Sequence, residues 1–257
     1  MAERTPLLVA NWKMHKTVHE AAAYVRELAT KARKIEGVEL VVAPPFTALA
    51  AAAEVARNTS VGIAAQDVAT AREGAFTGEV SALMIKDAGA DYVIVGHSER
   101  RRLFGDTDES VHQKTQAARG AGLTPIVCVG ETLEEREAGR TLAILDRQIK
   151  GGLHDLSGPD VASIAIAYEP VWAIGTGKNA TPAEADEAHR HIRARLGEWF
   201  GAVAADGCRI IYGGSVKPDN AGALLALPDV DGALVGGASL DVQTFFEIVS
   251  RSPGIQT

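Results

Sequence analysis

The sequence has few cysteines, few aromatic residues and no long hydrophobic segment. Its two cysteines, Cys128 and Cys208, lie in apolar, strand-like segments, which predicts reduced core residues and argues against a disulfide framework. Aromatic residues make up 5 % of the chain and hydrophobic residues 46 %, so the core is predicted to be aliphatic. No apolar segment has the form of a signal peptide or a membrane span. We therefore expect a soluble, cytoplasmic protein without a membrane partner.

The sequence also lacks any block of like charge. Its 26 basic and 33 acidic side chains give a net charge of −7, and they are interspersed. Nucleic-acid binding requires concentrated Lys and Arg, so no nucleic-acid partner is predicted. His15 and His19 have i, i+4 spacing, but no cluster of Cys, Asp or Glu accompanies them, so no metal site is predicted.

Short aliphatic segments alternate with longer helical ones along the chain. The predicted strands are Leu7–Asn11, Leu40–Ala43, Val61–Gln66, Asp91–Val95, Thr124–Val129, Ser163–Glu169, Arg209–Tyr212 and Ala233–Val235. The predicted helices are Ala21–Lys34, Ala48–Arg57, Ser81–Ala88, Ser110–Ala121, Thr132–Lys150, Pro182–Gly201, Pro218–Leu225 and Val242–Ser250. Eight such β–α units in about 250 residues, with right-handed crossovers, predict an α/β fold of the (β/α)8 TIM-barrel type.

An open, doubly wound sheet is the alternative fold. That fold expects a glycine-rich turn after the first strand, and this chain has Asn11-Trp12-Lys13-Met14-His15 there. No Pro-, Gly- or Ser-rich linker divides the chain, so residues 1–257 are predicted to form one domain.

In a barrel of this kind the chemistry lies just beyond the carboxyl ends of the strands. Polar and glycine residues gather at those positions, whereas the opposite end has the glycines that terminate helices. The strand-end residues are Asn11, Lys13, Gln66, His97, Ser98, Glu99, Glu131, Glu169, Gly213, Gly214, Ser215, Gly236 and Gly237. The sequence therefore predicts the site at this end.

Glu169 follows the sixth strand, and Pro170 ends the strand's hydrogen bonding because it has no N–H to donate. The next residues, Val171 to Ile174, are mostly apolar and lead into a glycine-containing loop. An apolar loop beside a strand-end acid is costly to expose unless it closes over something. This pattern predicts a lid above a general base. The alternative is a buried acid with a purely structural role.

Two glycine pairs follow the seventh and eighth strands. Barrel enzymes often bind phosphate between these two loops, at the start of a short helix. We predict a phosphate site formed by the N–H groups of Ser215, Gly236 and Gly237, joined by Gly175 of the lid. Glycine lets a phosphate approach the backbone. Each pair alone is also compatible with a simple tight turn.

His97 and Lys13 are the candidate partners of Glu169. His97 opens a predicted helical turn, whose positive end disfavours a charged imidazolium, so a neutral histidine that donates a hydrogen bond is plausible. A structural histidine is the alternative. Lys13 would stabilise the negative charge of the substrate and of a developing oxyanion. A solvated surface lysine is its alternative.

These residues together resemble the triosephosphate isomerase family, from the first strand to the last helix. The similar segments are residues 11–14, 95–101, 167–177, 212–216 and 234–239. The resemblance implies a cofactor-independent aldose–ketose isomerase that interconverts dihydroxyacetone phosphate and D-glyceraldehyde 3-phosphate through an enediolate, in glycolysis and gluconeogenesis. It implies that Glu169 is the base, His97 the neutral electrophile and Lys13 the electrostatic anchor.

The resemblance also implies supporting roles. Asn11 and Glu99 would support the reacting groups, and Tyr212 and Ser215 would hold the closed lid. Ile174 and Leu234 would form an apolar clamp, which we expect to raise the pKa of Glu169 by desolvation. The lid hinges would be Pro170-Val171-Trp172 and Lys178-Asn179-Ala180.

The long loop 66–79 carries Phe76 and Thr77 at its tip. In the resembled family this loop inserts into a second subunit, so a homodimer is predicted. Two other classes of function are the alternatives. A non-catalytic sensor of phosphometabolites would lack the base or the electrophile, and both are present. A Schiff-base aldolase needs a lysine inside a strand, and Lys13 lies beyond one.

Overall fold

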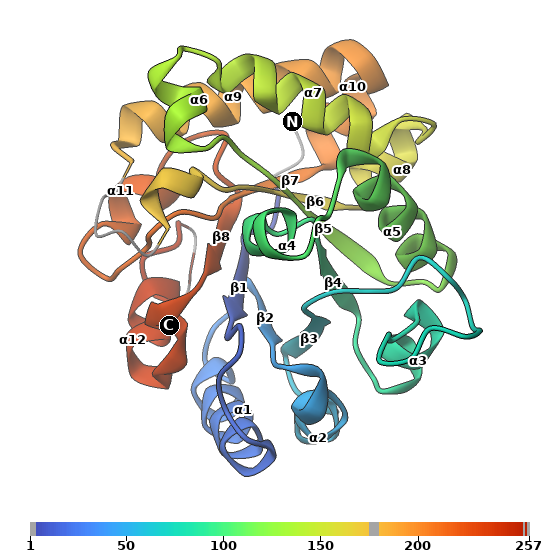
Figure 1. The fold of residues 1–257 in the computed structure, drawn as a ribbon. Helices are drawn as coiled ribbons and strands as arrows, with labels where there is room; N and C mark the ends of the chain where they lie inside the picture. Colours follow the sequence, from blue (N-terminus) through green and yellow to red (C-terminus); the bar gives the residue numbers. More distant parts are fainter. Residues whose placement is uncertain (1–3, 175–179, 254, 256–257) are drawn as a thin grey trace.

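Eight parallel strands form a closed barrel (Figure 1). The computed structural model describes residues 4–174, 180–253 and 255. The strands are β1 (Leu7–Asn11), β2 (Glu39–Ala43), β3 (Val61–Ala65), β4 (Tyr92–Val95), β5 (Thr124–Val129), β6 (Ala165–Tyr168), β7 (Arg209–Tyr212) and β8 (Gly232–Val235). Strand β1 pairs with β2 on one side and with β8 on the other. This closure confirms the predicted TIM barrel and excludes the open sheet.

The strands are buried on both faces, and alternate residues face different cores. In β1, Leu7 and Val9 belong to the cluster inside the barrel, whereas Leu8 and Ala10 belong to the cluster between barrel and helices. Both clusters are mainly aliphatic, as the composition predicts. The barrel interior is therefore filled by side chains, and ligands can bind only at its ends.

The helices surround the barrel (Figure 1). They are α1 (Val18–Ala32), α2 (Phe46–Ala56), α3 (Ala82–Asp87), α4 (Ser98–Leu103), α5 (Asp108–Gly120), α6 (Leu133–Glu137), α7 (Thr141–Leu153), α8 (Gly158–Ala162), α9 (Pro182–Phe200), α10 (Ala202–Gly207), α11 (Ala221–Leu225) and α12 (Val242–Val249). Short 3-10 turns span Val171–Ala173 and Gly237–Leu240. No helix in the described part of the chain is both long and apolar enough to cross a membrane.

The structure differs from the predicted elements mainly where helices break. The predicted helix Thr132–Lys150 is wrong as a single element, because Gly139 adopts a left-handed conformation with φ +66° between α6 and α7. The predicted helix Pro218–Leu225 begins only at Ala221. The turn predicted at His97 is the start of α4. Helices α8 and α10 were not predicted, because each is too short to show a clear period.

Candidate active site

The carboxyl ends of the strands surround a cavity of about 250 Å³. It is lined by Asn11, Lys13, His97, Glu169, Ile174, Gly213, Gly214, Ser215, Val216, Lys217, Leu234, Gly236, Gly237 and Ala238. The fold thus brings together the candidate base, electrophile and anchor with both glycine pairs. Glu99 and Tyr212 are not among the lining residues, although both contact residues of the site.

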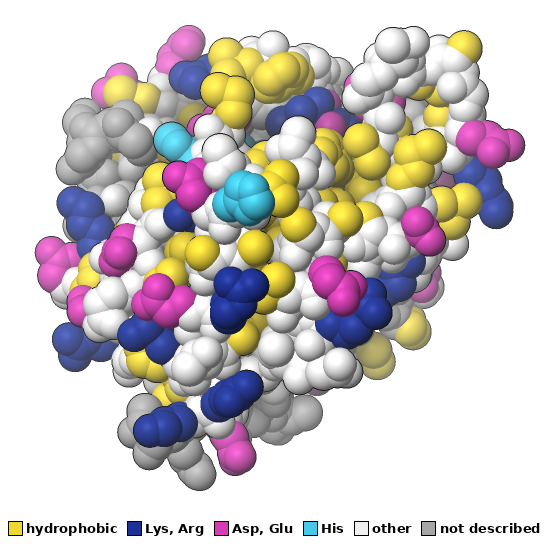
Figure 2. Space-filling view, turned by 90° about the horizontal axis from the view of Figure 1, so that it is seen from below, with side chains coloured by type: hydrophobic (Ala, Val, Ile, Leu, Met, Phe, Trp, Pro, Cys, Tyr) yellow, Lys and Arg dark blue, Asp and Glu magenta, His cyan; other side chains and the backbone are white. Residues whose placement is uncertain are grey.

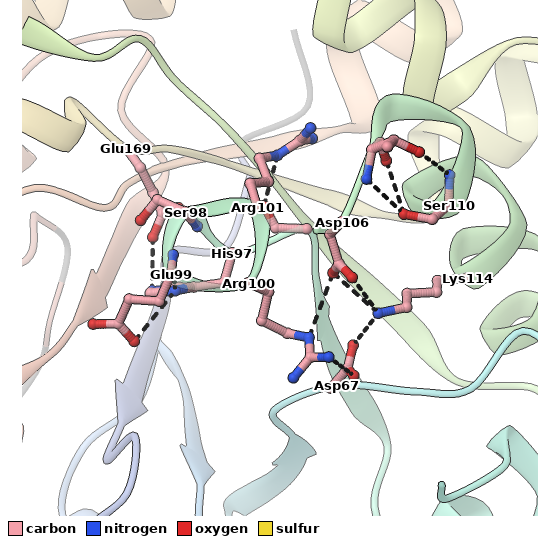
Figure 3. A network of polar contacts seen from close by, with 12 residues as sticks. Asp67, His97, Ser98, Glu99, Arg100, Arg101, Asp106, Ser110, Lys114 and Glu169 are labelled. Atoms are coloured by element: carbon pink, nitrogen blue, oxygen red, sulfur yellow. Dashed lines mark hydrogen bonds and ion pairs between the residues drawn. The ribbon is translucent and has the colours of Figure 1, made fainter. Parts of the chain in front are cut away.

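Glu169 lies directly after β6, and its side chain is almost completely buried. One carboxylate oxygen, Oε1, lies 2.9 Å from His97 Nε2. The other, Oε2, accepts a 2.8 Å hydrogen bond from the backbone N–H of Ser98. Figure 3 shows Glu169, His97 and Ser98 close together at the start of α4. In this arrangement the carboxylate is held against the N-terminal end of that helix.

These contacts determine the direction of the pKa shift of Glu169. Burial raises the pKa of this carboxyl group, but His97, the Ser98 N–H and Lys13 stabilise the charged form and together hold the pKa below its ordinary value. The expectation from sequence, a pKa raised by apolar surroundings, is therefore wrong for this conformation. The reason is that the carboxylate contacts polar donors, which outweigh its burial.

His97 caps the N-terminus of α4 through its ring. Its Nδ1 accepts a 3.2 Å hydrogen bond from the backbone N–H of Glu99, so Nδ1 has no proton and Nε2 carries it. The protonated Nε2 therefore lies beside Glu169 Oε1, at 2.9 Å but without the alignment of a hydrogen bond. Burial lowers the pKa of His97, and the neighbouring Glu169 carboxylate raises it by more, so the net direction is upward.

Lys13 adopts a left-handed backbone conformation with φ +53°, which is unusual for a residue other than glycine. Three contacts hold it there. Its N–H donates to Asn11 Oδ1 at 3.0 Å, and its carbonyl oxygen accepts from Gln66 Nε2 at 2.9 Å. Its ammonium group lies 2.6 Å from Glu99 Oε1. Asn11 and Glu99 thus occupy the supporting positions that were predicted, and Gln66 is a further positioning residue to which no role was assigned.

A buried ionic network packs behind α4 and fixes its position (Figure 3). Arg100 Nη2 lies 2.9 Å from Asp67 Oδ2, and Lys114 Nζ lies 2.8 Å from Asp67 Oδ1 and 2.9 Å from Asp106 Oδ1. Breaking one member of such a network leaves a buried charge unpaired, which is strongly destabilising. The network therefore holds the helix that carries His97.

The two glycine pairs differ in what surrounds them. A Cβ atom on Gly213 would lie 2.9 Å from Glu169 Cγ, and one on Gly214 would lie 2.9 Å from Pro170 Cγ. A Cβ atom on Gly237 would meet nothing within 4 Å. Close packing therefore requires glycine at the first pair, whereas at Gly237 the space around the backbone is open. Ser215, Gly236 and Gly237 all line the cavity, as predicted for an anion site.

Comparison with known proteins agrees with this geometry. The family model described as triosephosphate isomerase matches residues 6–252. The chain belongs to the triosephosphate isomerase family. Triosephosphate isomerases of Citrifermentans bemidjiense and Symbiobacterium thermophilum are each 54 % identical over 97 % of this chain, covering 99 % and 97 % of the relatives. The crystal structure of triosephosphate isomerase from Bartonella henselae is 39 % identical, with a TM-score of 0.88 over 96 % of this chain and 98 % of that one.

These relatives confirm that the chain is an enzyme, a triose-phosphate isomerase, as the resemblance implied.

The segment after Glu169 is the one for which a lid is predicted, and the side chain and backbone of its described part contact Glu131. Trp172 Nε1 donates to Glu131 Oε1 at 2.9 Å, and the Tyr168 hydroxyl lies 3.2 Å from both carboxylate oxygens. The N–H of Val171 donates to the Glu131 carbonyl oxygen at 3.1 Å. Glu131 is fully buried. The sequence pattern indicates Glu131 only as a strand-end residue, because a sequence does not show that the Trp172 indole N–H lies beside this buried acid.

Of the described clamp and hinge residues, only the two clamp residues line the cavity. Ile174 and Leu234 both line it. Tyr212 is fully buried, and its hydroxyl group has no hydrogen-bond partner among the described residues. Three predicted residues, Gly175, Lys178 and Asn179, lie outside the described residues. Phe76 and Thr77 are exposed on loop 66–79 and do not line the cavity.

Proposed function

We propose that this enzyme interconverts dihydroxyacetone phosphate and D-glyceraldehyde 3-phosphate by proton transfer through an enediolate. The proposal rests on one observation: Glu169, His97 and Lys13 line the same cavity as the glycines that follow β7 and β8. Proton transfer between adjacent carbons needs a base and an electrophile, and both are side chains of this chain. The proposal therefore includes no cofactor.

The cavity suggests how a triose phosphate binds. The phosphate would meet the N–H groups of Ser215, Gly236 and Gly237, with Gly175 completing the site when the lid closes. The carbonyl end would then point toward the opposite wall. There His97 Nε2–H would donate to the substrate oxygen, and the Lys13 ammonium would stabilise its developing negative charge.

Substrate binding also changes the base. The carbonyl oxygen would replace Glu169 as the partner of His97 Nε2, so the carboxylate would lose a contact that lowers its pKa. The apolar side chains of Ile174 and Leu234 would then surround it, and burial would raise its pKa toward that of a useful base. Likewise, His97 would lose the contact that raises its pKa, which favours the neutral ring.

In the proposed reaction Glu169 removes a proton from the carbon beside the carbonyl group. The electron pair moves onto the oxygen, where His97 and Lys13 stabilise the enediolate. His97 would give its Nε2 proton to this oxygen and take up the proton of the neighbouring hydroxyl group, so the negative charge moves to the other oxygen. The carboxyl group of Glu169 then returns its proton to the former carbonyl carbon as the new carbonyl group forms, which completes the exchange of ketose and aldose. The closed lid would exclude water and keep the intermediate from expelling its phosphate.

Turnover of glyceraldehyde 3-phosphate by the parent and by Glu169→Gln tests this function. The amide is similar in size but is a very weak base, so kcat should fall by several orders of magnitude while a phosphate-bearing analogue still binds. Glu187→Gln is the matched control, because Glu187 is exposed on α9, and its activity should equal the parent's. An active, unimpaired Glu169→Gln variant would show that another carboxylate is the base. An inactive parent that binds phosphate would favour a sensor.

We also propose that two copies form a homodimer through loop 66–79. Phe76 is 56 % exposed on this loop, and Met14, on the loop after β1 at the same end of the barrel, is 93 % exposed. Hydrophobic side chains gather on the upper right of the face shown in Figure 2. A concentration of exposed apolar groups is typical of a subunit interface.

We further propose that the enzyme acts in the cytoplasm, in glycolysis and gluconeogenesis. The two free cysteines are both buried, which suits a reducing compartment. Cell fractionation and the growth of a deletion strain on glycolytic and gluconeogenic carbon sources would test these two points.

A further inference from the structure

Away from the cavity, the fold brings two histidines and an aspartate together at the surface. His112 lies on α5, and His154 and Asp155 directly follow α7. Their ligand atoms all lie within 4.8 Å of one another. The imidazole rings of His112 and His154 stack with centroids 3.6 Å apart. None of the three residues lines the catalytic cavity.

Each imidazole presents a nitrogen lone pair. His154 Nδ1 lies 3.0 Å from the carbonyl oxygen of Gly151, and a carbonyl can only accept, so Nδ1 carries the proton and Nε2 is free of one. His112 Nδ1 is buried and has no hydrogen-bond partner among the described residues.

This arrangement has the features of a metal-ligand set. A histidine whose second nitrogen donates to a backbone carbonyl is fixed in orientation and tautomer, which is the usual support for a ligating ring. His112 is buried, with 8 % of its surface exposed. A buried nitrogen without a hydrogen-bond partner lowers the stability of the folded protein, and a bound cation would remove that desolvation penalty. His154 and Asp155 are far more exposed and can adjust.

We propose that His112, His154 and Asp155 form a surface site for a borderline divalent cation such as Zn²⁺. Two imidazoles and one carboxylate suit such an ion, and water would fill the remaining position. Ligand atoms around Zn²⁺ stand about 3.4 Å apart in a tetrahedral site, given bonds of about 2.1 Å. His154 Nε2 and Asp155 Oδ2 are already 3.9 Å apart. Closing the set requires the exposed side chains of His154 and Asp155 to rotate, so that the two imidazole rings leave their stacked arrangement.

The bound ion would link α5 to the end of α7. It would stabilise the junction between these helices, because an ion that binds only the folded state raises its stability by mass action. The proposal does not depend on the isomerase reaction, since the site and the catalytic cavity share no residue.

Zn²⁺ affinity, measured with ZnCl₂ by competition with a chromogenic chelator on protein freed of metal, tests the site. His154→Ala should weaken binding at least about tenfold, because it removes one ligand from an exposed position. Asp155→Asn should weaken it less, since the amide oxygen remains a weaker ligand. His19→Ala is the control. It disrupts the i, i+4 pair of His15 and His19, which belongs to a different segment of the chain, and it should leave the affinity unchanged.

A second measurement separates ligation from structure. Without metal, His154→Ala should unfold at the parent's temperature, and with ZnCl₂ only the parent and His19→Ala should gain stability. In the parent, Zn²⁺ should also shift the ring ¹⁵N resonances of His112. Equal affinity in the parent and His154→Ala would overturn the proposal. Loss of binding in His19→Ala would place the ion on α1 and would overturn it too.

Discussion

Glu169 and His97 form a buried contact that the proposed reaction must open. The carboxylate is stabilised as an anion by His97 and the Ser98 N–H, so its pKa lies below the ordinary value in this conformation. A base with a low pKa is a weak one. The energy that frees the carboxylate must therefore come from substrate binding, since the substrate oxygen takes its place at His97.

His189 makes the stability of the protein depend on pH. It is fully buried on α9, where burial lowers its pKa to about 4, below the ordinary value of 6.5. As the pH falls from 6.5 toward 4, the unfolded chain binds a proton that the folded chain does not, so stability is lost. Between pH 7 and pH 5 the loss from this residue should be about 2 kcal/mol.

Urea unfolding of the parent and of His189→Gln at both pH values checks this prediction. The variant should lose about 2 kcal/mol less than the parent between pH 7 and pH 5, because its side chain does not titrate. His19→Ala removes an exposed histidine and should keep the parent's dependence. The same loss in all three proteins would assign the acid sensitivity to other groups.

The sequence predicts individual residues well where a strand end determines their place. Glu169, His97 and Lys13 were located because each lies within two residues of the end of a strand, and the barrel brings strand ends together. Glu131 and Gln66 received no role, because their contacts depend on partners 41 and 53 residues away. The direction of the Glu169 pKa shift also depends on side-chain orientation, which a sequence pattern does not contain.

At the scale of elements, the loop after β7 contains two glycines that close packing requires. A Cβ atom on Gly214 would lie 2.9 Å from Pro170 Cγ and closer still to the Tyr212 hydroxyl. This loop therefore packs directly against the first residue after Glu169. The first hinge of the proposed lid and the phosphate loop can be adjacent only because Gly214 has no side chain.

Gly214→Ala should therefore destabilise the protein by about 2 kcal/mol, the usual cost of overpacking. In a chain of this size the unfolding temperature should fall by about 5 °C. Because the clash also displaces Pro170, kcat should fall as well. Thermal unfolding and turnover measure both effects.

Gly222→Ala is the matched control for this substitution. A Cβ atom there meets nothing within 4 Å, and the residue lies in α11, where alanine is the better helix former. Its unfolding temperature should be equal to the parent's or higher. A Gly214→Ala variant as stable and active as Gly222→Ala would contradict the packing argument.

Element boundaries follow from the sequence when a specific residue fixes them. The predicted start of α9 at Pro182 is confirmed, and Thr181 fixes it with a capping box, since the threonine accepts from the Glu184 N–H. The break at Gly139 is not predicted, because this glycine lies within a helical pattern, although its left-handed conformation separates α6 from α7. A single glycine in a helical pattern is tolerated often enough that its sequence context did not reveal the break.

At the scale of the molecule, the eight-fold alternation of strand and helix sufficed to predict the closed barrel. Eight parallel strands with buried faces leave two edges, and pairing β1 with β8 removes both. The proposed dimer has less support from the sequence, because it depends on the family resemblance, and the structure adds only the exposure of Phe76, Thr77 and Met14 among the described residues.

Thr77→Arg tests the proposed dimer. Thr77 is exposed on the loop, so arginine should be tolerated in a single subunit but should obstruct a complementary pocket in a second one. Sedimentation should show a shift from dimer to monomer, with turnover reduced at least about tenfold. Thr30→Arg on the exposed side of α1 should remain dimeric and active. A fully active dimer of Thr77→Arg would exclude this loop from the interface.

The pairing of β1 with β8 has a consequence for synthesis. Leu7 pairs with Gly232, and Arg4 contacts Asp231, so the first strand waits for a partner that lies about 225 residues further along the chain. At about 5–20 residues per second, translation takes on the order of ten seconds or more to supply it. During that interval the nascent chain exposes an unpaired strand edge on the ribosome. Shielding of this edge by chaperones should therefore matter more for yield in the cell than the stability of the finished barrel.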